Sequence, residues 1–523
     1  MLPAQDCTNA TKSLLATCLH FLTYINVQLF SASQFCKMKT ETLDSLRQIN
    51  FADDLTDNAG SIKPAIVGIS ISLFMMNLDT SIVSVGLPTM IKNLNTTFAS
   101  GQWFVLIYLL VLTALITAAG RLGDMVGKKK LFLYGISIFT MASLLCGLSC
   151  NAAFLVLFRG LQGLGAALIL SLGMAIASEL TPKKHLGKTM GVLSTITALG
   201  IASGPSAGGI LISTFGWQSM FLVNVPFGII AYWLTYKFVN LPAIKKTINI
   251  DWIGIMLLAA TLSCYCIGMI MIEKKGLSNP IVLALLAMTL IGLFAFVQFE
   301  RKKTYPLLDV SIFANKLISR NLIVTVLVYT VIITTVILPP FYLLKAANYS
   351  LVKVGLIMSF GPLVTVAFSV YAGKVADKYG AKNVMFYAVL LIAIGCLCMS
   401  TITPAANITG YLWRIGIIAM GLNFFKTPNN TVIMEVAKPD QRGLLSSFLS
   451  LSRILGQITG TAVMGVIFAV LSGVSNTSQS NNAPQSITYA FNRIFLLNAF
   501  IALFAALLIY TKMFKHVHKF DKR

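Results

Sequence analysis

Charged residues are scarce in this sequence: they make up 11% of 523 residues, and only 17 residues are Asp or Glu. Soluble domains carry about 25% charged residues, so the composition excludes a soluble protein. The chain has four histidines, and its nine cysteines include no Cys-x-x-Cys pair. Because neither metal ligands nor catalytic nucleophiles cluster, we expect no metal site and no enzymatic activity.

A nucleotide-binding loop is also missing. The segment at residues 123–129 superficially resembles one, but it is one residue short and lacks Ser or Thr after the lysine. It also follows a long apolar segment, whereas a phosphate-binding loop follows a buried strand. We therefore expect no ATP hydrolysis and no bound cofactor.

Long apolar runs dominate instead, since 56% of the residues are hydrophobic. Fourteen stretches of roughly 20 residues are long enough to cross the ~30 Å hydrocarbon core, and a backbone in lipid favours helices. We predict an all-α polytopic membrane protein with about 14 transmembrane helices. They are expected at residues 64–87, 103–119, 131–148, 153–172, 190–213, 220–237, 252–271, 281–299, 322–343, 354–371, 384–400, 408–429, 445–471 and 493–510.

Basic residues exceed acidic ones by 23, and they lie mainly in every second connection between the apolar runs. Those connections and the C-terminal tail hold 25 Lys and Arg, whereas the opposite set of connections holds six. By the positive-inside rule, both termini are expected in the cytoplasm. The excess therefore indicates orientation in a membrane and argues against a nucleic-acid partner.

The N-terminal 62 residues fit this pattern least. Residues 14–30 are moderately apolar, and residues 31–33 weakly resemble a signal-peptidase site. One interpretation is an over-extended reading frame, with Met38 as the true start, or a loose interfacial segment. Another is an additional membrane span. A cleaved signal peptide is the third, but it would place the new N-terminus outside, which conflicts with the charge count. We expect residues 1–62 to be a cytoplasmic or poorly ordered extension.

An internal repeat divides the remaining chain. The sequence GRLGDMVGKK at residues 120–129 recurs as GKVADKYGAK at residues 373–382. If each copy follows the second helix of a six-helix bundle, the bundles comprise residues 63–240 and 304–515. Residues 241–303 are then an inserted helix pair, and residues 516–523 are a basic cytoplasmic tail. Repeated bundles with a site between them are typical of secondary transporters.

Six motifs follow one another along the chain. They are LDTSIV and GLP at residues 78–88, QW and YLL at 102–110, the loop at 120–130, RGLQGLG at 159–165, GIASGPSAGG at 200–209, and Trp217 with NVPFG at 224–228. In this order they resemble the major facilitator superfamily, in its fourteen-span drug:proton antiporter branch of the QacA/EmrB type. Met125, Gln218 and Ser84 depart from that pattern.

The resemblance implies alternating access and export of lipophilic small molecules in exchange for protons, with the proton gradient as the energy source. It also implies a multi-pass protein of a bacterial inner membrane. The expected partners are the substrates, protons and the lipid bilayer, and the need for a periplasmic adaptor stays open.

Asp79 is the one acidic residue deep within an expected span, about 12 Å from the nearer helix end at 1.5 Å per residue. An ionisable side chain is costly to bury within a membrane span, so an acid at such a depth indicates a functional site. It shares a helical face with Met75 and Met76, whose flexible thioethers can repack around apolar molecules, so both are candidate cavity residues. The alternative is a buried acid that only hydrogen-bonds a neighbouring helix.

Arg159 lies at a similar depth in the fourth expected span and is the natural partner of Asp79. Burial disfavours a charged carboxyl, whereas a nearby arginine favours it. Movement of one residue relative to the other can therefore load and release a proton. The alternative is that Arg159 only bonds backbone carbonyls. Proton coupling through Asp79 and Arg159 is also what the resemblance implies.

The fifth expected span carries a stripe of small residues. Gly200, Gly204 and Gly208 are spaced by four and allow close helix contact, and Pro205 removes one backbone donor. With Gly209 they form the segment that resembles the antiporter motif, which in that family is implied to prevent leak. Tight packing alone is the alternative.

The repeated loop contributes the candidate gating residues Gly120, Asp124, Gly127 and Lys128, and Asp377 from the second copy. A loop carboxylate can cap a helix N-terminus or pair with a basic residue, and it loses that contact when the bundles move. The alternative is a pair of tight turns with solvated charges.

Polar residues in the other spans are candidates for a substrate cavity. They are Gln162, Arg414, Asn423, Lys426, Arg453 and Gln457. Lys426 and Arg453 could instead extend toward the membrane surface. Four basic residues within spans against one deep acid favour neutral, anionic or monocationic lipophiles as substrates.

The sequence is compatible with three functions. Proton-coupled export is favoured by the Gly-Pro stripe of the fifth span. A proton symporter or a lipid or metabolite transporter of the same fold is the alternative, and a channel or receptor-like membrane protein is the remote one.

Overall fold

The computed structural model describes residues 59–182, 186–240, 251–303, 315–403, 407–436, 442–473 and 484–520. Residues Gly60–Arg523 form one compact unit. The extension over residues 1–58, with the alternative start Met38, lies outside the described residues, as do the last three residues of the tail.

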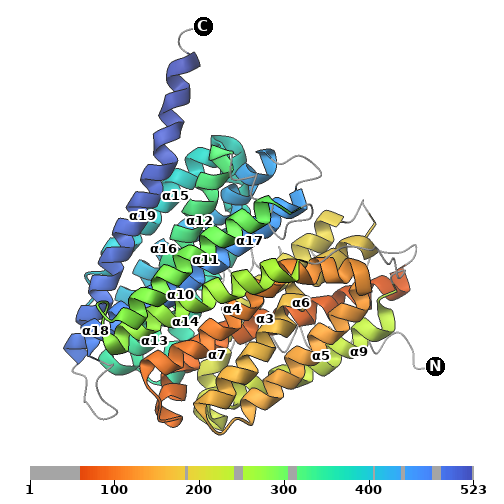
Figure 1. Ribbon diagram of the computed structural model, residues 1–523, viewed down its shortest axis with the longest axis horizontal. Helices are drawn as coiled ribbons and strands as arrows, with labels where there is room; N and C mark the ends of the chain where they lie inside the picture. Colours follow the sequence, from red (N-terminus) through yellow and green to blue (C-terminus); the bar gives the residue numbers. More distant parts are fainter. Residues whose placement is uncertain are drawn as a thin grey trace, which may run out of the picture. The chain divides into compact units, whose positions relative to one another are not determined.

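Within the described residues the chain is helical and contains no strand. Figure 1 labels most of the helices, which are numbered in chain order. They are α3 (Ala59–Asn93), α4 (Phe98–Val126), α5 (Lys128–Gly147), α6 (Ala152–Leu180), α7 (Leu186–Phe215), α8 (Ser219–Leu222), α9 (Asn224–Phe238), α10 (Trp252–Lys275), α11 (Pro280–Arg301), α12 (Lys316–Ile337), α13 (Pro339–Phe341), η3 (Tyr342–Ala346), α14 (Leu351–Tyr379), α15 (Ala381–Met399), α16 (Ile408–Val436), α17 (Arg442–Thr459), η5 (Gly460–Met464), α18 (Gly465–Ser472) and α19 (Pro484–Phe520).

Fourteen helical stretches in the described residues are long and apolar enough to cross a membrane, which confirms the expected number. Three of them are composite. The span Ser219–Phe238 joins α8 to α9. The span Lys316–Ala346 joins α12 and α13 to the π-helical turn η3, and the span Phe448–Ser472 joins α17 to α18 through the π-helical turn η5. Such wide turns are often found at functional sites.

Helix contacts fall into two groups. In the first, α6 packs on α4 and α5, α5 packs on α9, and α3 packs closely on α7 and α9 through glycines. In the second, α16 packs on α14 and α15, while α19 packs on α12 and α15, and α17 on α12. The groups meet where α7 contacts α14 and where α4 contacts α17 and α18. This arrangement agrees with two six-helix bundles, whereas their predicted boundaries stay predictions.

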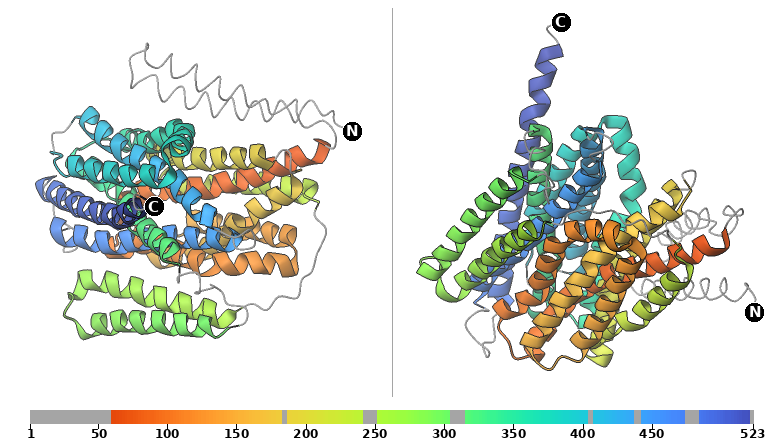
Figure 2. Two further views of the ribbon diagram at one scale, coloured as in Figure 1. Left: turned by 90° about the horizontal axis from the view of Figure 1, so that it is seen from above. Right: turned by 45° about the vertical axis from the view of Figure 1, so that its right-hand side comes forward.

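The expected inserted pair is α10 and α11, which pack on each other, and α10 also contacts α4 and α18. Figure 2 shows the pair along one flank of the remaining helices. In the most apolar part of α11 only 11% of the residues are buried, as expected for a helix that faces lipid. Asp251 caps the start of α10 by accepting a hydrogen bond from the Gly254 backbone N–H at 3.0 Å.

The sequence repeat is also a repeat of backbone geometry. Gly127 lies between α4 and α5 with φ of 104°, and Gly380 lies between α14 and α15 with φ of 84°. Their backbone N–H groups donate to the carbonyls of Gly123 and Ala376, four residues earlier, and so end the two helices in the same way. A positive φ strains residues that have a Cβ atom, which explains why both copies keep glycine here.

Candidate functional site

Asp79 is completely buried in α3. Its Oδ2 accepts a hydrogen bond from Nη1 of Arg159 in α6 at 2.6 Å, so the two residues form an ion pair. Its Oδ1 accepts from Nε2 of Gln162 in α6 and from Nδ2 of Asn224 in α9, both at 2.9 Å. Three side-chain donors from two helices therefore hold the carboxylate.

The guanidinium of Arg159 is 1% exposed and has further partners. Its Nε donates to the backbone oxygen of Phe104 in α4 at 2.8 Å, and its Nη1 also donates to Oε1 of Gln162 at 2.6 Å. Its Cζ lies 4.4 Å from the centroid of the Tyr108 ring, within cation–π range. Arg159 thus pairs with Asp79 and also bonds a backbone carbonyl. The alternative that Arg159 bonds only backbone carbonyls is therefore wrong, while its role in proton coupling stays a prediction.

Gln162 extends the hydrogen bonds into α5. Its Nε2 also donates to Oγ of Ser143 at 2.7 Å, and this hydroxyl donates to the Phe139 carbonyl at 2.8 Å. The candidate cavity residue Gln162 is therefore a completely buried connector in this structure. We call Asp79, Ser143, Arg159, Gln162 and Asn224 the buried polar network.

Two glycines of α6 make this close assembly possible. A Cβ atom at Gly163 would lie 2.7 Å from the backbone oxygen of Tyr108 in α4, and one at Gly165 would lie 2.6 Å from the backbone nitrogen of Phe139 in α5. The backbones of α4 and α5 cannot move aside as the end of a flexible side chain can, so a Cβ atom at either glycine would push the helices apart. The glycines therefore let α6 fit between α4 and α5, which brings Arg159 within reach of its partners on α3 and α4.

Sequence reasoning did not assign Ser143 and Asn224 to this site. Asn224 was visible only as part of the NVPFG motif, as a polar residue that opens the apolar helix α9. Ser143 carried no signal, because a serine within a helix commonly bonds the carbonyl one turn earlier, as Ser143 also does. The Oδ1 of Asn224 is buried and has no hydrogen-bond partner among the described residues.

The glycine stripe of α7 packs on α3 beside the network. A Cβ atom at Gly200, Gly204 or Gly208 would lie 2.8, 2.5 or 2.7 Å from atoms of α3. The three positions meet the helical turns before and after Asp79. In addition, the hydroxyl of Ser81 donates to a backbone carbonyl of α7 at 2.8 Å. Movement of α7 is thus mechanically connected to the helix that carries the buried carboxylate.

The other side of α7 packs on α14 of the second group. A Cβ atom at Gly209 would lie 2.8 Å from a backbone oxygen at the start of α14, and Gly355 of α14 lies against the backbone carbonyl of Pro205. The backbone N–H of Ser206 donates to Oγ of Ser359 in α14 at 3.1 Å. Small residues therefore allow a backbone-to-backbone contact between the two helix groups.

A second contact between the groups is aromatic. Phe98 at the start of α4 lies against Phe341 of α13 and Phe468 of α18, with ring centroids 5.1 and 5.7 Å apart. Beside them Gln102 of α4 is completely buried against Gly465 of α18. This contact closes the Phe98 end of α4 against the second group.

The candidate gating residues are only partly described. Gly120 lies in the last part of α4, and Nζ of Lys128 forms an ion pair with Oε1 of Glu179 in α6. This pair ties the start of α5 to the end of α6. The side chains of Asp124 and Asp377 lie outside what the structure describes, so their pairing stays a prediction.

Arg414 lies apart from the other candidate cavity residues. Its Nε donates to the Cys398 carbonyl at 2.8 Å, and its Nη1 donates to the Gly410 carbonyl at 2.7 Å. These bonds place the guanidinium at the C-terminal end of α15, where the carbonyls carry partial negative charge. In this conformation the contacts of Arg414 stabilise a helix end.

Lys426 and Arg453 lie within the second helix group. Lys426 on α16 is exposed. Arg453 on α17 is half-buried, and its Nη2 donates to Oδ1 of Asn430, one turn beyond Lys426. The Cζ of Arg453 lies 5.9 Å from the centroid of the Tyr329 ring in α12. The structure therefore brings polar residues of α16 and α17 together beside an aromatic ring.

The other candidate cavity residues differ in exposure. Gln457 of α17 is half-buried, one turn after Arg453. Asn423 of α16 is 3% exposed. Met75 and Met76 are 0% and 5% exposed and belong to the packed core of the first helix group. A contribution of the two methionines to a cavity stays a prediction for another conformation.

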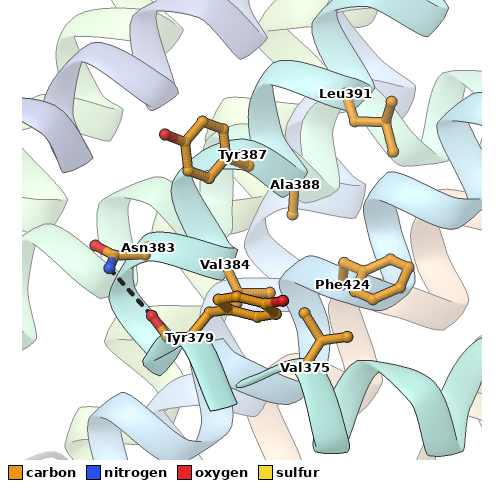
Figure 3. Close-up of a pocket in the computed structure, with 8 residues that line it drawn as sticks. All are labelled: Val375, Tyr379, Asn383, Val384, Tyr387, Ala388, Leu391 and Phe424. Carbon is orange, nitrogen blue, oxygen red and sulfur yellow. Dashed lines mark hydrogen bonds between the residues drawn. The ribbon is translucent and has the colours of Figure 1, made fainter. Parts of the chain in front are cut away.

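A separate groove lies between α14, α15 and α16, near the Tyr379 end of α14. It has a volume of about 470 Å³. Figure 3 shows the aromatic rings of Tyr379, Tyr387 and Phe424 around it. The only polar side-chain groups in its lining are two phenol hydroxyls and the Asn383 amide, so its chemistry is that of an apolar surface groove. It shares no residue with the buried polar network.

The described residues contain no group of three or more His, Cys, Asp or Glu side chains that could hold a metal ion. At Asp79 the structure instead shows one ionisable carboxylate that is completely buried and held by three side-chain donors.

The family model described as Major Facilitator Superfamily matches residues 69–300 and 321–521 of the chain. The riboflavin transporter RibZ of Clostridioides difficile (strain 630) is 31% identical over 405 residues, which cover 77% of this chain and 88% of that protein. The multidrug resistance protein Stp of Mycobacterium tuberculosis (strain CDC 1551 / Oshkosh) is 28% identical over 410 residues, which cover 77% and 75%.

Among solved structures, a bacterial homologue of the human lysosomal transporter Spinster, in an inward-facing and unoccupied conformation, has a TM-score of 0.64. The two sequences are 14% identical, and the match covers 87% of this chain and 97% of that one. At this identity the likeness concerns the fold alone.

Proposed function

The chain belongs to the Major Facilitator Superfamily, and we propose that it is a proton-coupled antiporter that exports lipophilic small molecules by alternating access. Membership makes it a multi-pass membrane transporter and not an enzyme. Similarity to the multidrug resistance protein Stp supports drugs as the substrate class.

The observation that carries the proposal is the buried ion pair of Asp79 and Arg159. Removing one partner of such a pair costs about 3–5 kcal/mol, because the other charge is left buried and unpaired. A transporter can use this free-energy difference to couple protonation of Asp79 to a change of conformation. When a proton neutralises Asp79, Arg159 loses the one carboxylate that it pairs with among the described residues, and the preferred packing of α3 against α6 changes.

The glycine stripe of α7 can transmit that change from α3 to the second helix group. Gly200 and Gly204 fix α7 against the turns of α3 that flank Asp79, while Gly209 on the other side of α7 contacts α14. A shift of α3 on protonation therefore acts on the contact between the two helix groups. In this mechanism Asp79 exchanges the proton, Arg159 stabilises the deprotonated state, and α7 transmits the movement.

We propose the orientation indicated by the basic residues, with both termini in the cytoplasm of a bacterium and the chain in its inner membrane. The Phe215 end of α7 and the Phe98 end of α4 then face outward. Both contacts between the helix groups lie toward these ends, so this conformation is closed toward the outside. The proton-loading state is the opposite one, in which both contacts have separated.

Transport into everted membrane vesicles tests the proposal. The wild-type protein should accumulate lipophilic dyes when a proton gradient is imposed and should stop when an uncoupler collapses it. In the variant Asp79→Asn the amide still accepts from Arg159 but cannot carry a proton, so proton-driven transport should fall to background while substrate binding stays measurable.

The variant Asp251→Asn is the matched control, because asparagine caps a helix as well as aspartate and Asp251 lies at the start of α10, outside the network. It should transport like the wild type. Undiminished transport by Asp79→Asn would remove the carboxylate from the mechanism.

Transport of a vitamin-like aromatic metabolite is the second candidate. It is favoured by the 31% identity to a protein named as a riboflavin transporter. Uptake of labelled riboflavin into everted and right-side-out vesicles separates the candidates by substrate and by direction. Saturable riboflavin uptake into right-side-out vesicles alone, without dye transport into everted ones, would favour a symporter over the proposed exporter.

A further inference from the structure

The face formed by Asn423, Lys426 and Asn430 of α16 and by Arg453 of α17 is rich in donors. The buried Nδ2 of Asn423 and Nε of Arg453 have no hydrogen-bond partner among the described residues. The Oδ1 of Asn430 already accepts from Arg453. Lys426 adds an ammonium group with three donors and no acceptor. Donors thus outnumber the acceptors that these residues offer.

Lys426 lies within α16, about 15 Å from the Val436 end and about 27 Å from the Ile408 end at 1.5 Å per residue. Its side chain is exposed. Charged residues within spans face the bundle interior or water. The exposed ammonium therefore marks an interior surface that is open to solvent or substrate.

Among the described residues, no carboxylate forms an ion pair with Lys426 or Arg453. Between Asp377 and Glu435 the chain has no acidic residue, and from Glu435 onward the only others are Asp440 and Asp521, which lie outside the spans. Glu435 is nine residues, or about 14 Å, beyond Lys426 along α16. In the first helix group, by contrast, the charge of Arg159 is balanced by Asp79.

Both cations have Asn430 as a neighbour. Lys426 and Asn430 are four residues apart, so their Cβ atoms lie about 5–6 Å from each other, and Asn430 bonds Arg453 directly. Like charges around a common neighbour disfavour each other. An anion that bonds both residues removes this repulsion and satisfies the unpartnered donors, which neither a neutral nor a cationic molecule does.

We propose that Lys426 and Arg453 form the substrate subsite for an anionic group, and that the transported molecules are aromatic or otherwise apolar organic anions. The inference rests on the proposed function and narrows its substrate class. The carboxylate, sulfonate or phosphate of the substrate bonds Lys426 and Arg453, with Asn423 as a further donor. The Tyr329 ring beside Arg453 offers an apolar surface to the remainder of the molecule.

Two dyes with one scaffold test the subsite. 8-Anilinonaphthalene-1-sulfonate carries an anionic group that N-phenyl-1-naphthylamine lacks. In vesicles with the full-length protein we expect proton-driven transport of the sulfonate with the lower KM. Loss of one charge-assisted hydrogen bond costs about 1.5–3 kcal/mol, so Lys426→Gln and Arg453→Gln should each raise the KM for the sulfonate about ten- to a hundredfold.

The matched control is Lys275→Gln, which removes one exposed lysine at the end of α10. It should leave both KM values unchanged. The reversal Lys426→Glu should abolish sulfonate transport and raise transport of the cation ethidium. Because Lys426 is exposed, its substitutions remove no packed contact. Retained transport of N-phenyl-1-naphthylamine shows that the Lys426 and Arg453 variants are folded.

The outcomes separate the two proposals. If no dye moves in response to a proton gradient, the proposed antiport is wrong. If the neutral and cationic dyes move and the sulfonate does not, antiport stands and the anionic subsite is refuted. A uniform rise of all KM values in Lys426→Gln would also refute the subsite, because it would indicate a general structural effect.

Charge movement is an independent readout. Exchange of one outgoing monoanion for one incoming proton moves two positive charges inward, whereas a neutral substrate moves one and a monocation moves none. In proteoliposomes clamped with potassium and valinomycin, an inside-negative potential should therefore accelerate sulfonate export more than export of the neutral dye. Equal dependence on potential for both dyes would overturn the inference.

Discussion

Gly209→Ala is the sharpest perturbation of the contact between the two helix groups. The added Cβ atom would lie 2.8 Å from a backbone oxygen of α14, whereas ordinary contact begins at 3.4 Å. The two backbones must therefore separate by about 0.6 Å at this point. Such overpacking costs about 1–3 kcal/mol. The cost falls only on the conformation in which α7 and α14 touch, so the ratio of closed to open molecules should fall about five- to 150-fold.

Double electron–electron resonance measures this ratio. Spin labels at Phe215→Cys on α7 and Lys353→Cys on α14 occupy exposed positions near the contact, after replacement of the reactive native cysteines by serine. Wild-type protein should show mainly the short distance, and Gly209→Ala should show a larger long-distance population. Transport should fall, since the cycle spends less time in the state that is closed at this end.

Gly191→Ala is the control for this experiment, because it lies on the same helix and an added Cβ there meets nothing within 4 Å. It should give the wild-type distance distribution and transport rate. An unchanged distribution in Gly209→Ala would refute the reasoning that this contact determines the conformation. An equal shift of the distance distribution in Gly191→Ala and Gly209→Ala would refute the same reasoning.

Three further predictions concern other contacts. Gly127→Ala and Gly380→Ala should each lower the free energy of unfolding by about 1–2 kcal/mol, because they force a residue with a Cβ atom into positive φ. Thermal unfolding measures this loss, and Gly373→Ala, whose Cβ would meet open space, is the control. Gly204→Leu should impair export more than membrane insertion, since even a Cβ there would lie 2.5 Å from α3; normal export would contradict the mechanical connection. Asn224→Ala removes one of the three side-chain donors to the buried carboxylate and should slow dye export into everted vesicles; export at the wild-type rate would contradict a role of Asn224 in the network.

The number and type of helices followed from local properties of the sequence. A run of twenty apolar residues must be helical in lipid wherever it packs, and a short motif such as the turn at Gly127 needs only its own backbone. For the same reason the repeated turn at Gly380 was recognisable from residue identities alone. The presence of Asp79 deep in a span was likewise visible, since depth depends only on position along one helix.

The partners of that carboxylate depended on packing. Arg159 and Gln162 are separated from Asp79 by 80 and 83 residues, and the pairing of Arg159 with Asp79 was predicted from equal depth alone. The roles of Asn224 and Gln162 in the same network required knowledge of which helices adjoin. Gln162 looked like a cavity residue because a polar side chain in a span has the same sequence signature whether it faces a cavity or a buried partner.

The sequence by itself determined that this chain is a fourteen-span transporter with a repeated bundle, because apolar length, charge distribution and local motifs are properties of single segments. Only the tertiary structure decided that α6 fits between α4 and α5, that α7 connects α3 to α14, and that Arg453 meets Asn430. These contacts depend on the close approach of separate helices. For α6 and α7 the approach is set by glycines whose partners the sequence does not identify.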